Sequence, residues 1–500
     1  MKILNFIIPV LFGLIGIFAF APFSIKFLIF ISYAYLIHKI LYEKTYRFLT
    51  VFLWGIGHWG FGMSWIIVSV YYYGETSIAL SLLIYFLLLI ILSLVFTCPL
   101  LLIRYLLNKL EITKNYQIIL AASSLLMIGE ISRYHFLNGV PWLIPGNIYL
   151  DTITQNIYPL FGVSAASLTM YVLCCYLVVF YNKNRNFLSI ILLIIISIIP
   201  NYKSTVDVDD GTLVSIIQPS SDPFKKYKLE YQKQIEDKLI HLLNKTSDSS
   251  EIIVLPEAEL PYFIKTTRFD QFVKKVPKSE NILMGAWDQD HKGNVYNTVY
   301  SLNNYNFSLK KDLDSYKKMH LVPFGEYIPF IESLRGLVGF FDLPMSNVMH
   351  GPENQKNITI MKDTPIETPI CFDIAFANTV RIMNKSSFLM INVSNDTWFG
   401  NSIGPYQHLN IARIRSIENN RWSIRATNDG VSAIIANNGT IVDKIEKGDI
   451  GILEGKVQLI SKNTFYSSYG YLFSYIFSLI MVLLTIFIGI WKKTSSKQHF

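Results

Sequence analysis

The stretch from Lys318 to Tyr327 reads Lys-Met-His-Leu-Val-Pro-Phe-Gly-Glu-Tyr. It joins a lysine to a glutamate, Glu326, across a largely apolar segment that ends in Pro-Phe-Gly. A single lysine is usually a solvated surface residue, and Lys317 stands directly beside this one. Lys318 is therefore a candidate for chemistry only if other reactive side chains of the chain meet it.

Two other stretches place a reactive side chain at the end of an apolar run. Residues 252–257 read Ile-Ile-Val-Leu-Pro-Glu and end at Glu257, and residues 369–373 read Pro-Ile-Cys-Phe-Asp and hold Cys371. We expect both runs to be strands, because each is short and apolar. Strand ends in an α/β fold are where the next loop opens a pocket, so Glu257, Lys318 and Cys371 are candidates for one site.

The three stretches belong to a region in which short apolar runs alternate with helical patterns. The runs that we expect to be strands are Leu213–Ile217, Ile252–Leu255, Ile282–Trp287, Val299–Leu302, Pro369–Phe372, Phe388–Val393, Ser423–Ala426 and Val431–Ile435. Helical patterns cover Lys228–Leu243 and Tyr406–Asn419. This alternation predicts an α/β domain over residues 201–469, which begins with the polar linker Asn201–Gly211. The region has no metal-ligand spacing and no phosphate-binding glycine loop, so we expect neither a metal nor a cofactor.

The rest of the chain is far more apolar. Of the 500 residues, 51% are hydrophobic and only 16% are charged, against about 25% charged residues in a typical soluble protein. This composition excludes a disordered chain and an ordinary cytosolic enzyme. A membrane-spanning helix needs about 20 mostly apolar residues. The candidate runs lie at roughly 4–21, 23–38, 49–71, 78–103, 116–132, 157–181, 186–200 and 470–491. They predict a seven-span domain over residues 1–200 and, over residues 470–500, a final helix with a cytoplasmic tail.

The charges between these runs predict an orientation. Twelve Lys and Arg residues fall on one side of the eight predicted spans, and only Lys26 and Arg133 fall on the other. Under the positive-inside rule the basic side faces the cytoplasm, so residues 201–469 face the periplasm of a double-membraned bacterium. A cleaved signal peptide is the alternative for the first run, but Pro22 directly follows the small-residue site at 19–21 and disfavours cleavage.

The net charge of +8 does not indicate nucleic acid. Residues 201–469 hold 30 basic and 31 acidic residues, so the surplus lies between the apolar runs. The cysteines are also unevenly placed. Three of them lie within predicted spans, and Cys371 alone lies in the α/β region. A thiol without a partner in an oxidising compartment is a candidate reactive group.

A glutamate, a lysine and a cysteine are sufficient for acyl transfer. A thiol is a weak nucleophile until it is deprotonated, and a nearby carboxylate can take its proton. A lysine ammonium lowers the pKa of the thiol and stabilises the negative oxygen of a tetrahedral intermediate. A second carboxylate holds the lysine in place and keeps it charged.

In this order, Glu257, Lys318 and Cys371 resemble the nitrilase superfamily, whose catalytic set is Glu-Lys-Cys on an αββα sandwich. The longer pattern Lys-x-x-Leu-Val-Pro-Phe-Gly-Glu-Tyr is similar to the apolipoprotein N-acyltransferase family, the membrane-embedded branch of that superfamily. Further positions that resemble this family are Asn392–Gly400, Gly404–His408, Arg413, Arg415, Glu418, Arg425, Asn428 and Gly430. Seven predicted spans before the domain and one after it also match, so the resemblance covers essentially the whole chain.

The resemblance implies roles for the candidate residues. Glu257 would be the general base, Lys318 the oxyanion stabiliser and Cys371 the nucleophile. Glu326 would be a supporting carboxylate near the lysine. The backbone N–H of Phe372 would complete the oxyanion hole.

Three positions depart from the family pattern, and we assign them to substrate binding. The family usually has Tyr and then Glu after the cysteine, where this chain has Phe372 and Asp373. It usually has Trp where this chain has Tyr227. Phe372 lacks the hydroxyl and Asp373 has a shorter carboxylate, whereas Tyr227 keeps an aromatic face for contact with lipid.

The resemblance also implies the reaction and its place. A fatty acyl chain passes from a membrane phospholipid to Cys371 as a thioester, and then to the N-terminal amine of diacylglyceryl-cysteine on an apolipoprotein. This ping-pong transfer in the bacterial inner membrane needs no cofactor and no nucleic acid. One alternative is a membrane-tethered amidase in which water replaces the amine. The other is a transporter or scaffold with a degenerate domain, against which the intact Glu257, Lys318 and Cys371 argue.

Overall fold

The chain forms two compact units. The computed structural model describes residues 3–74, 76–136, 139–181, 184–201, 208, 210–277, 281–302, 313–323, 325–327, 347–361 and 363–497. One unit comprises Met1–Ile66, Ala79–Tyr202 and Tyr469–Phe500, and the other comprises Ile67–Ile78 and Lys203–Ser468. The second unit thus combines the predicted α/β region with a short segment, residues 67–78, from the apolar part of the sequence. Most of the predicted linker, with Phe324 and Lys183, lies outside the described residues.

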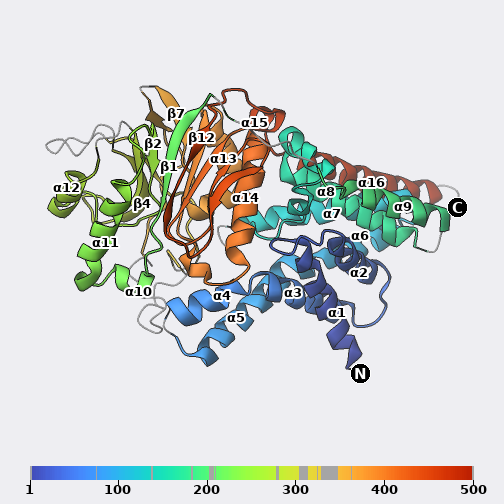
Figure 1. Cartoon of the computed structure of the whole chain (residues 1–500). Coiled ribbons are helices and arrows are strands. Elements are labelled where there is room, and N and C mark those ends of the chain that lie inside the picture. Colours follow the sequence, from blue (N-terminus) through green and yellow to red (C-terminus); the bar gives the residue numbers. More distant parts are fainter. Residues whose placement is uncertain are drawn as a thin grey trace. The chain divides into compact units, whose positions relative to one another are not determined.

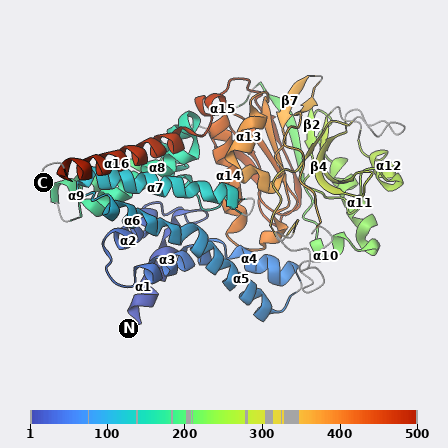
Figure 2. The same ribbon diagram turned by 180° about the vertical axis from the view of Figure 1, so that it is seen from behind.

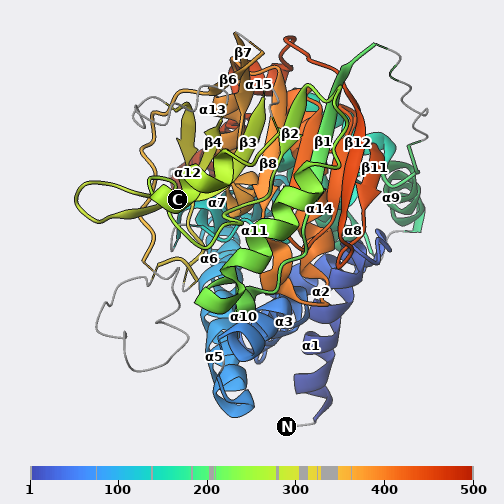
Figure 3. The ribbon, with the colours of Figure 1, turned by 60° about the vertical axis from the view of Figure 1, so that its left-hand side comes forward.

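The second unit is built on two six-stranded sheets, ordered β12-β1-β2-β3-β4-β5 and β11-β10-β9-β8-β7-β6 (Figure 3). The strands are β1 (Thr212–Gln218), β2 (Ile252–Val254), β3 (Ile282–Gln289), β4 (Val295–Ser301), β5 (Ser315–Lys317), β6 (Ile358–Ile360), β7 (Thr364–Glu367), β8 (Leu389–Ser394), β9 (Ser423–Thr427), β10 (Ser432–Ile435), β11 (Ile441–Ile445) and β12 (Gly451–Val457). Strands β1 to β3 are parallel, as are β7 to β9, and the outer strands pair antiparallel. Parallel strands at the centre of a sheet are covered on both faces, and the sequence of β2 (Ile-Ile-Val) is accordingly apolar throughout.

The two sheets pack face to face, and helices cover their outer faces (Figure 1). The helices of this unit are α10 (Pro223–Lys226), α11 (Leu229–Leu243), α12 (Thr267–Val273), α13 (Ala377–Asn384), α14 (Gly404–Asn419) and α15 (Phe465–Tyr469). Ile216 of β1 and Ile391 of β8 belong to one core between the sheets. Leu239 of α11 and Phe269 of α12 pack on the other face of the first sheet, and α13 and α14 lie on the opposite side of the sandwich (Figure 2). The unit is therefore a nitrilase-like αββα sandwich.

Most of the predicted elements of this unit are confirmed, and one is wrong. Seven of the eight predicted strands correspond to β1–β4 and β8–β10, and the two predicted helices correspond to α11 and α14. No strand covers Pro369–Phe372: β7 ends at Glu367, and a short 3₁₀ helix begins at Cys371. Cys371 has a φ of +45°, in the left-handed region that strands do not use. The prediction failed because this backbone reversal has no glycine or asparagine to mark it.

The first unit is helical. Its helices, with α4 at the boundary between the units, are α1 (Leu4–Ile15), α2 (Leu28–Tyr42), α3 (Arg47–Gly62), α4 (Trp65–Val68), α5 (Ile78–Leu92), α6 (Leu102–Lys109), α7 (Asn115–His135), α8 (Tyr158–Val179), α9 (Asn184–Ser197) and α16 (Phe473–Lys497). Helices α7, α8 and α16 lie side by side (Figure 2). Many large apolar side chains on these helices are exposed. Such exposure is expected of helices that contact lipid.

Fewer helices are long and apolar enough to cross a membrane than the eight spans that the sequence predicts. Among the described residues, three helical stretches are long and apolar enough to cross a membrane: Ile78–Lys109, Ile153–Val179 and Phe473–Thr494. A fourth is a pair of helices, Arg47–Gly62 and Trp65–Tyr72, bent by 58°. A helix overlaps each of the eight predicted runs, but several of these helices are too short to meet this test, so eight spans are not confirmed.

Candidate active site

Glu257 lies just beyond the carboxyl end of β2, where β3 approaches its backbone closely. A Cβ atom at Gly285 of β3 would lie 2.6 Å from the Cα of Glu257, so glycine is required at this crossing. Ala258 follows with a φ of +43°, which turns the chain away from the sheet. The Oε1 atom of Glu257 accepts a hydrogen bond of 2.6 Å from Asn297 Nδ2 on β4. Glu257 is therefore held with its carboxylate turned toward the neighbouring strand ends.

Lys318 directly follows β5 and lies between two carboxylates. Its Nζ is 3.2 Å from Glu257 Oε1 and 2.8 Å from Glu326 Oε1. All three residues are buried, with exposures of 2% for Lys318, 6% for Glu257 and 8% for Glu326. Burial by itself would lower the pKa of Lys318, but the two carboxylates outweigh it and raise that pKa well above its usual value. The lysine is therefore charged throughout the physiological pH range.

Glu326 is fixed by its own turn. Its Oε2 accepts a hydrogen bond of 2.8 Å from the backbone N–H of Val322, and its backbone N–H donates to the carbonyl of Val322. Asn297 Nδ2 also reaches Glu326 Oε1, at 3.3 Å. One amide thus bridges both carboxylates that hold Lys318. Asn297 was not among the predicted site residues, although a polar residue within an apolar strand is a signal that the sequence contains.

Cys371 joins this group from the second sheet. The thiol lies within electrostatic reach of both Glu257 and Lys318. Burial raises the pKa of Cys371, the Glu257 carboxylate raises it further, and Lys318 lowers it without cancelling the increase. The resting group is accordingly a neutral thiol, which must lose a proton before it can attack. The structure therefore brings together all four residues that the sequence placed in one catalytic set.

The carboxylate of Asp373 is buried and accepts hydrogen bonds from within the protein. Its Oδ1 accepts a hydrogen bond of 2.7 Å from the backbone N–H of His320. Its Oδ2 accepts one of 3.0 Å from the hydroxyl of Tyr316 and one of 3.2 Å from the N–H of Ile370. Burial raises the pKa of Asp373 to about 7, against the lowering effects of Lys318 and the backbone donors. The carboxylate ties residues on both sides of Lys318 to the turn that carries Cys371.

The other two predicted substrate-binding residues are aromatic. Phe372 is half-buried, and its ring meets the edge of Phe376 with centroids 5.2 Å apart. Tyr227 follows α10 and is also half-buried. Burial raises the pKa of Tyr227, a hydrogen bond with Trp287 opposes this increase, and Glu259 and Glu257 add to it.

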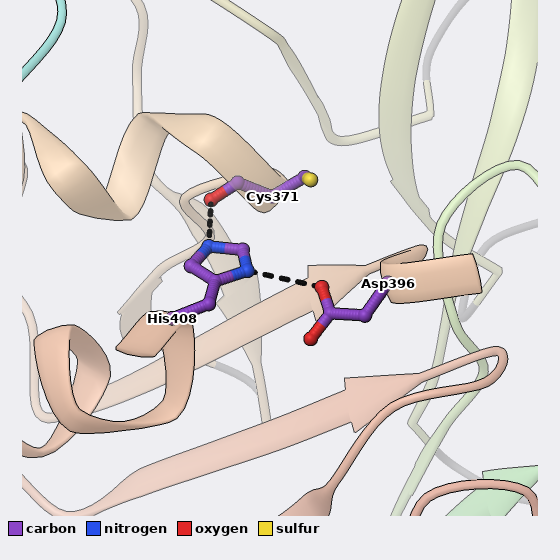
Figure 4. Close-up of side chains that lie close together, drawn as sticks. All are labelled: Cys371, Asp396 and His408. Atoms are coloured by element: carbon purple, nitrogen blue, oxygen red, sulfur yellow. Dashed lines mark hydrogen bonds and ion pairs between the residues drawn. The ribbon is translucent and has the colours of Figure 1, made fainter. Parts of the chain in front are cut away.

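A second polar cluster lies behind Cys371 (Figure 4). His408 of α14 has Nε2 3.1 Å from the carbonyl oxygen of Cys371 and Nδ1 3.0 Å from Asp396 Oδ1. Arg425 lies 2.7 Å from Asp396 Oδ2. Among the described residues, Cys371, Asp396 and His408 form the one group whose ligand types could hold a metal ion. The carboxylate of Asp396 and both ring nitrogens of His408 already have hydrogen-bond partners within the protein. The adjacent guanidinium of Arg425 also opposes the binding of a second cation.

The chain is similar to known proteins along nearly its whole length. A carbon-nitrogen hydrolase family model matches residues 213–461, and a model of the apolipoprotein N-acyltransferase N-terminal domain matches residues 12–176. An apolipoprotein N-acyltransferase of Pasteurella multocida is 30% identical over 499 residues, which cover 94% of this chain and 92% of that protein. The enzyme of the same name from Haemophilus influenzae is 30% identical over 490 residues, with the same shares covered. A crystal structure of a carbon-nitrogen hydrolase from Helicobacter pylori aligns with a TM-score of 0.35 and 15% identity, over 50% of this chain and 90% of that one.

Proposed function

The chain belongs to the apolipoprotein N-acyltransferase family and is an acyltransferase, and we propose that it completes bacterial lipoproteins through a thioester on Cys371. The donor is a membrane phospholipid, and the acceptor is the N-terminal amine of diacylglyceryl-cysteine on an apolipoprotein. The observation that carries the proposal is the buried Lys318, held between Glu257 and Glu326 beside a neutral thiol. No other catalytic group is needed for acyl transfer.

The first half-reaction forms the thioester. Glu257 takes the proton of Cys371, and the thiolate attacks the ester carbonyl of the phospholipid. Negative charge develops on the carbonyl oxygen, where the Lys318 ammonium and the N–H of Phe372 stabilise it. The C–O bond then breaks, Glu257 returns the proton to the leaving alkoxide, and a lysophospholipid departs. A base is required because the thiol is protonated at rest.

The second half-reaction uses the same groups. The α-amine of the acceptor attacks the thioester, Glu257 takes a proton from the nitrogen, and Lys318 again faces the negative oxygen. The C–S bond breaks, and the Cys371 thiolate leaves and regains its proton. The products are the N-acylated lipoprotein and the free thiol. Glu326 keeps Lys318 charged and aligned in both halves, while Tyr227 and Phe372 contribute apolar contact with the acyl chains and Asp373 holds the cysteine turn.

The helical unit is proposed to bring both lipid substrates to this site by lateral diffusion. We propose a domain of seven spans over residues 1–200, a catalytic domain over residues 201–469 and a last span within residues 470–500. Helices shorter than about 20 residues can still cross a bilayer that thins locally around them. The bias of the connecting Lys and Arg residues supports an inner-membrane protein whose catalytic domain faces the periplasm.

Mass spectrometry of the products tests the reaction. Purified full-length protein in detergent, given phospholipid and a synthetic diacylglyceryl lipopeptide, should add one acyl chain to the peptide through an amide on its N-terminal nitrogen. The amide should resist hydroxylamine, and a lipopeptide with an acetylated N-terminus should gain nothing. Released free fatty acid with no amide, at any acceptor concentration, would instead identify an amidase-like hydrolase.

Reporter fusions test the orientation. A phosphatase that is active only after export should be active when fused at Asn244, directly after α11, because this position is expected in the periplasm. The same reporter should be inactive when fused near Lys183, in a predicted cytoplasmic connection. The reverse pattern would overturn the proposed topology.

A further inference from the structure

Cys371 has a backbone conformation that its own side chain does not favour. Its φ of +45° is left-handed, and non-glycine residues hold such angles only where their surroundings impose them. The residue begins the 3₁₀ helix Cys371–Ala375, four residues beyond the end of β7. Something outside this turn must therefore keep the cysteine in place while its sulfur reacts.

The carbonyl oxygen of Cys371 is hydrogen-bonded to a residue of α14. His408 Nε2 lies 3.1 Å from this oxygen, and the histidine is almost fully buried. Figure 4 shows the carbonyl oxygen pointing at the ring, and the sulfur lies within 4.8 Å of one of the ring nitrogens. A carbonyl oxygen only accepts hydrogen bonds, so Nε2 carries the proton. The ring thus bonds to the backbone of the nucleophile, while the thiol lies within electrostatic reach of Glu257 and Lys318.

The other edge of the ring is fixed by a buried ion pair. Nδ1 of His408 lies 3.0 Å from Arg425 Nη2 and 3.0 Å from Asp396 Oδ1. Nδ1 accepts from the Arg425 guanidinium when the ring is neutral and donates to the Asp396 carboxylate when the ring is charged, and in both states Nε2 carries a proton. Asp396 is in turn bound by Arg425 and by the hydroxyl of Ser394 at 2.7 Å. This network gives the imidazole one orientation, with its donor aimed at Cys371.

We propose that His408 is a positioning residue, which holds the left-handed backbone of Cys371 through the Nε2–H and so aims the thiol at the donor carbonyl. This inference rests on the proposed thioester. It assigns a function to a residue that does not touch the reacting atoms. Losing the bond should slow both half-reactions and leave substrate binding unchanged, because a nucleophile displaced by about 1 Å costs roughly a hundredfold in rate.

Two amide substitutions separate this bond from the rest of the network. In His408→Gln the side-chain N–H₂ reaches the place of Nε2, whereas in His408→Asn it reaches only the place of Nδ1. We expect His408→Asn to lower the rate of acyl-adduct formation on Cys371 about a hundredfold, with KM for phospholipid unchanged. His408→Gln should stay within about tenfold of the wild type. Ser416→Ala is the control, since this buried hydroxyl of the same helix bonds only weakly, at 3.3 Å, to its own helix, and it should react at the wild-type rate.

The outcomes distinguish this inference from the function on which it rests. Intact-mass measurements on full-length protein in detergent, with thermal midpoints recorded alongside, follow the adduct in each variant. Equal rates for His408→Asn and His408→Gln would overturn the positioning role, whether both are fast or both are slow. An adduct that is absent even in the wild type would overturn the thioester itself.

Discussion

Replacing Cys371 by Ala or Ser should abolish acyl transfer. Removal of a nucleophile that acts together with a base typically costs roughly 10⁵-fold or more in kcat, which places both variants below detection. Neither substitution should prevent folding, because the side chain is only half-buried and each replacement is smaller or of similar size. The measurement is N-acylation of the lipopeptide, with circular dichroism and gel filtration to verify that the protein is folded.

A matched control is available within the chain. Cys98 is also a half-buried free cysteine, but it lies in the helical unit. Cys98→Ser should keep wild-type activity, and it should also keep the acyl adduct that Cys371→Ser loses. Transfer by Cys371→Ala at the wild-type rate would eliminate the covalent mechanism altogether.

Replacing Lys318 by Ala should lower the rate of acyl-adduct formation by about 10²- to 10³-fold, the usual cost of losing one donor to a developing oxyanion. The expected adduct should have the mass of one fatty acyl chain, should form with phospholipid alone and should be released by hydroxylamine. Lys318→Ala also leaves Glu257 and Glu326 buried without their shared cation, at a cost of about 3–5 kcal/mol in stability. The rate must therefore be measured at a temperature where the variant is folded.

Two further variants make this result specific. Glu257→Gln keeps the size of the side chain and its bond to Asn297, yet it removes the base, so it should also prevent the adduct. Lys317→Ala is the neighbouring control. Its ammonium lies 3.5 Å from Asp288 and 3.7 Å from the centre of the Tyr296 ring, outside the catalytic set. If Lys317→Ala slowed the adduct as much as Lys318→Ala, the loss would reflect general charge and not an oxyanion site.

Several parts of the site were predictable because they are formed by residues that lie close together in the sequence. The apolar run before Glu257 predicts β2, since a strand buried on both faces needs apolar residues throughout. The turn from Val322 to Glu326 is also local, because the backbone and side chain of Glu326 bond to the same residue four positions earlier. These features depend on neighbours in the chain.

Other parts were not predictable because they depend on partners distant in the chain. Strand β12 pairs with β1 across more than two hundred residues, and its half-exposed sequence carries no strong strand pattern. Asn297 bridges Glu257 and Glu326 only when the sheet has formed in the order β2-β3-β4-β5, because the two glutamates follow β2 and β5. The left-handed backbone of Cys371 was mistaken for a strand, since the residue that bonds its carbonyl, His408 of α14, is 37 positions away in the chain.

The sequence by itself therefore determined the residue types of the catalytic set, the apolar strands and helices, and the family. These follow from the order of residues and from the free energy of burying apolar side chains, which are properties of the chain. Only the tertiary structure decided that Lys318 lies between two carboxylates, that burial raises the pKa of the Cys371 thiol, and that His408 Nε2 lies 3.1 Å from the cysteine carbonyl oxygen. Charge, pKa and backbone strain depend on which groups lie within a few ångströms of one another. The packing of the two sheets brings those groups together.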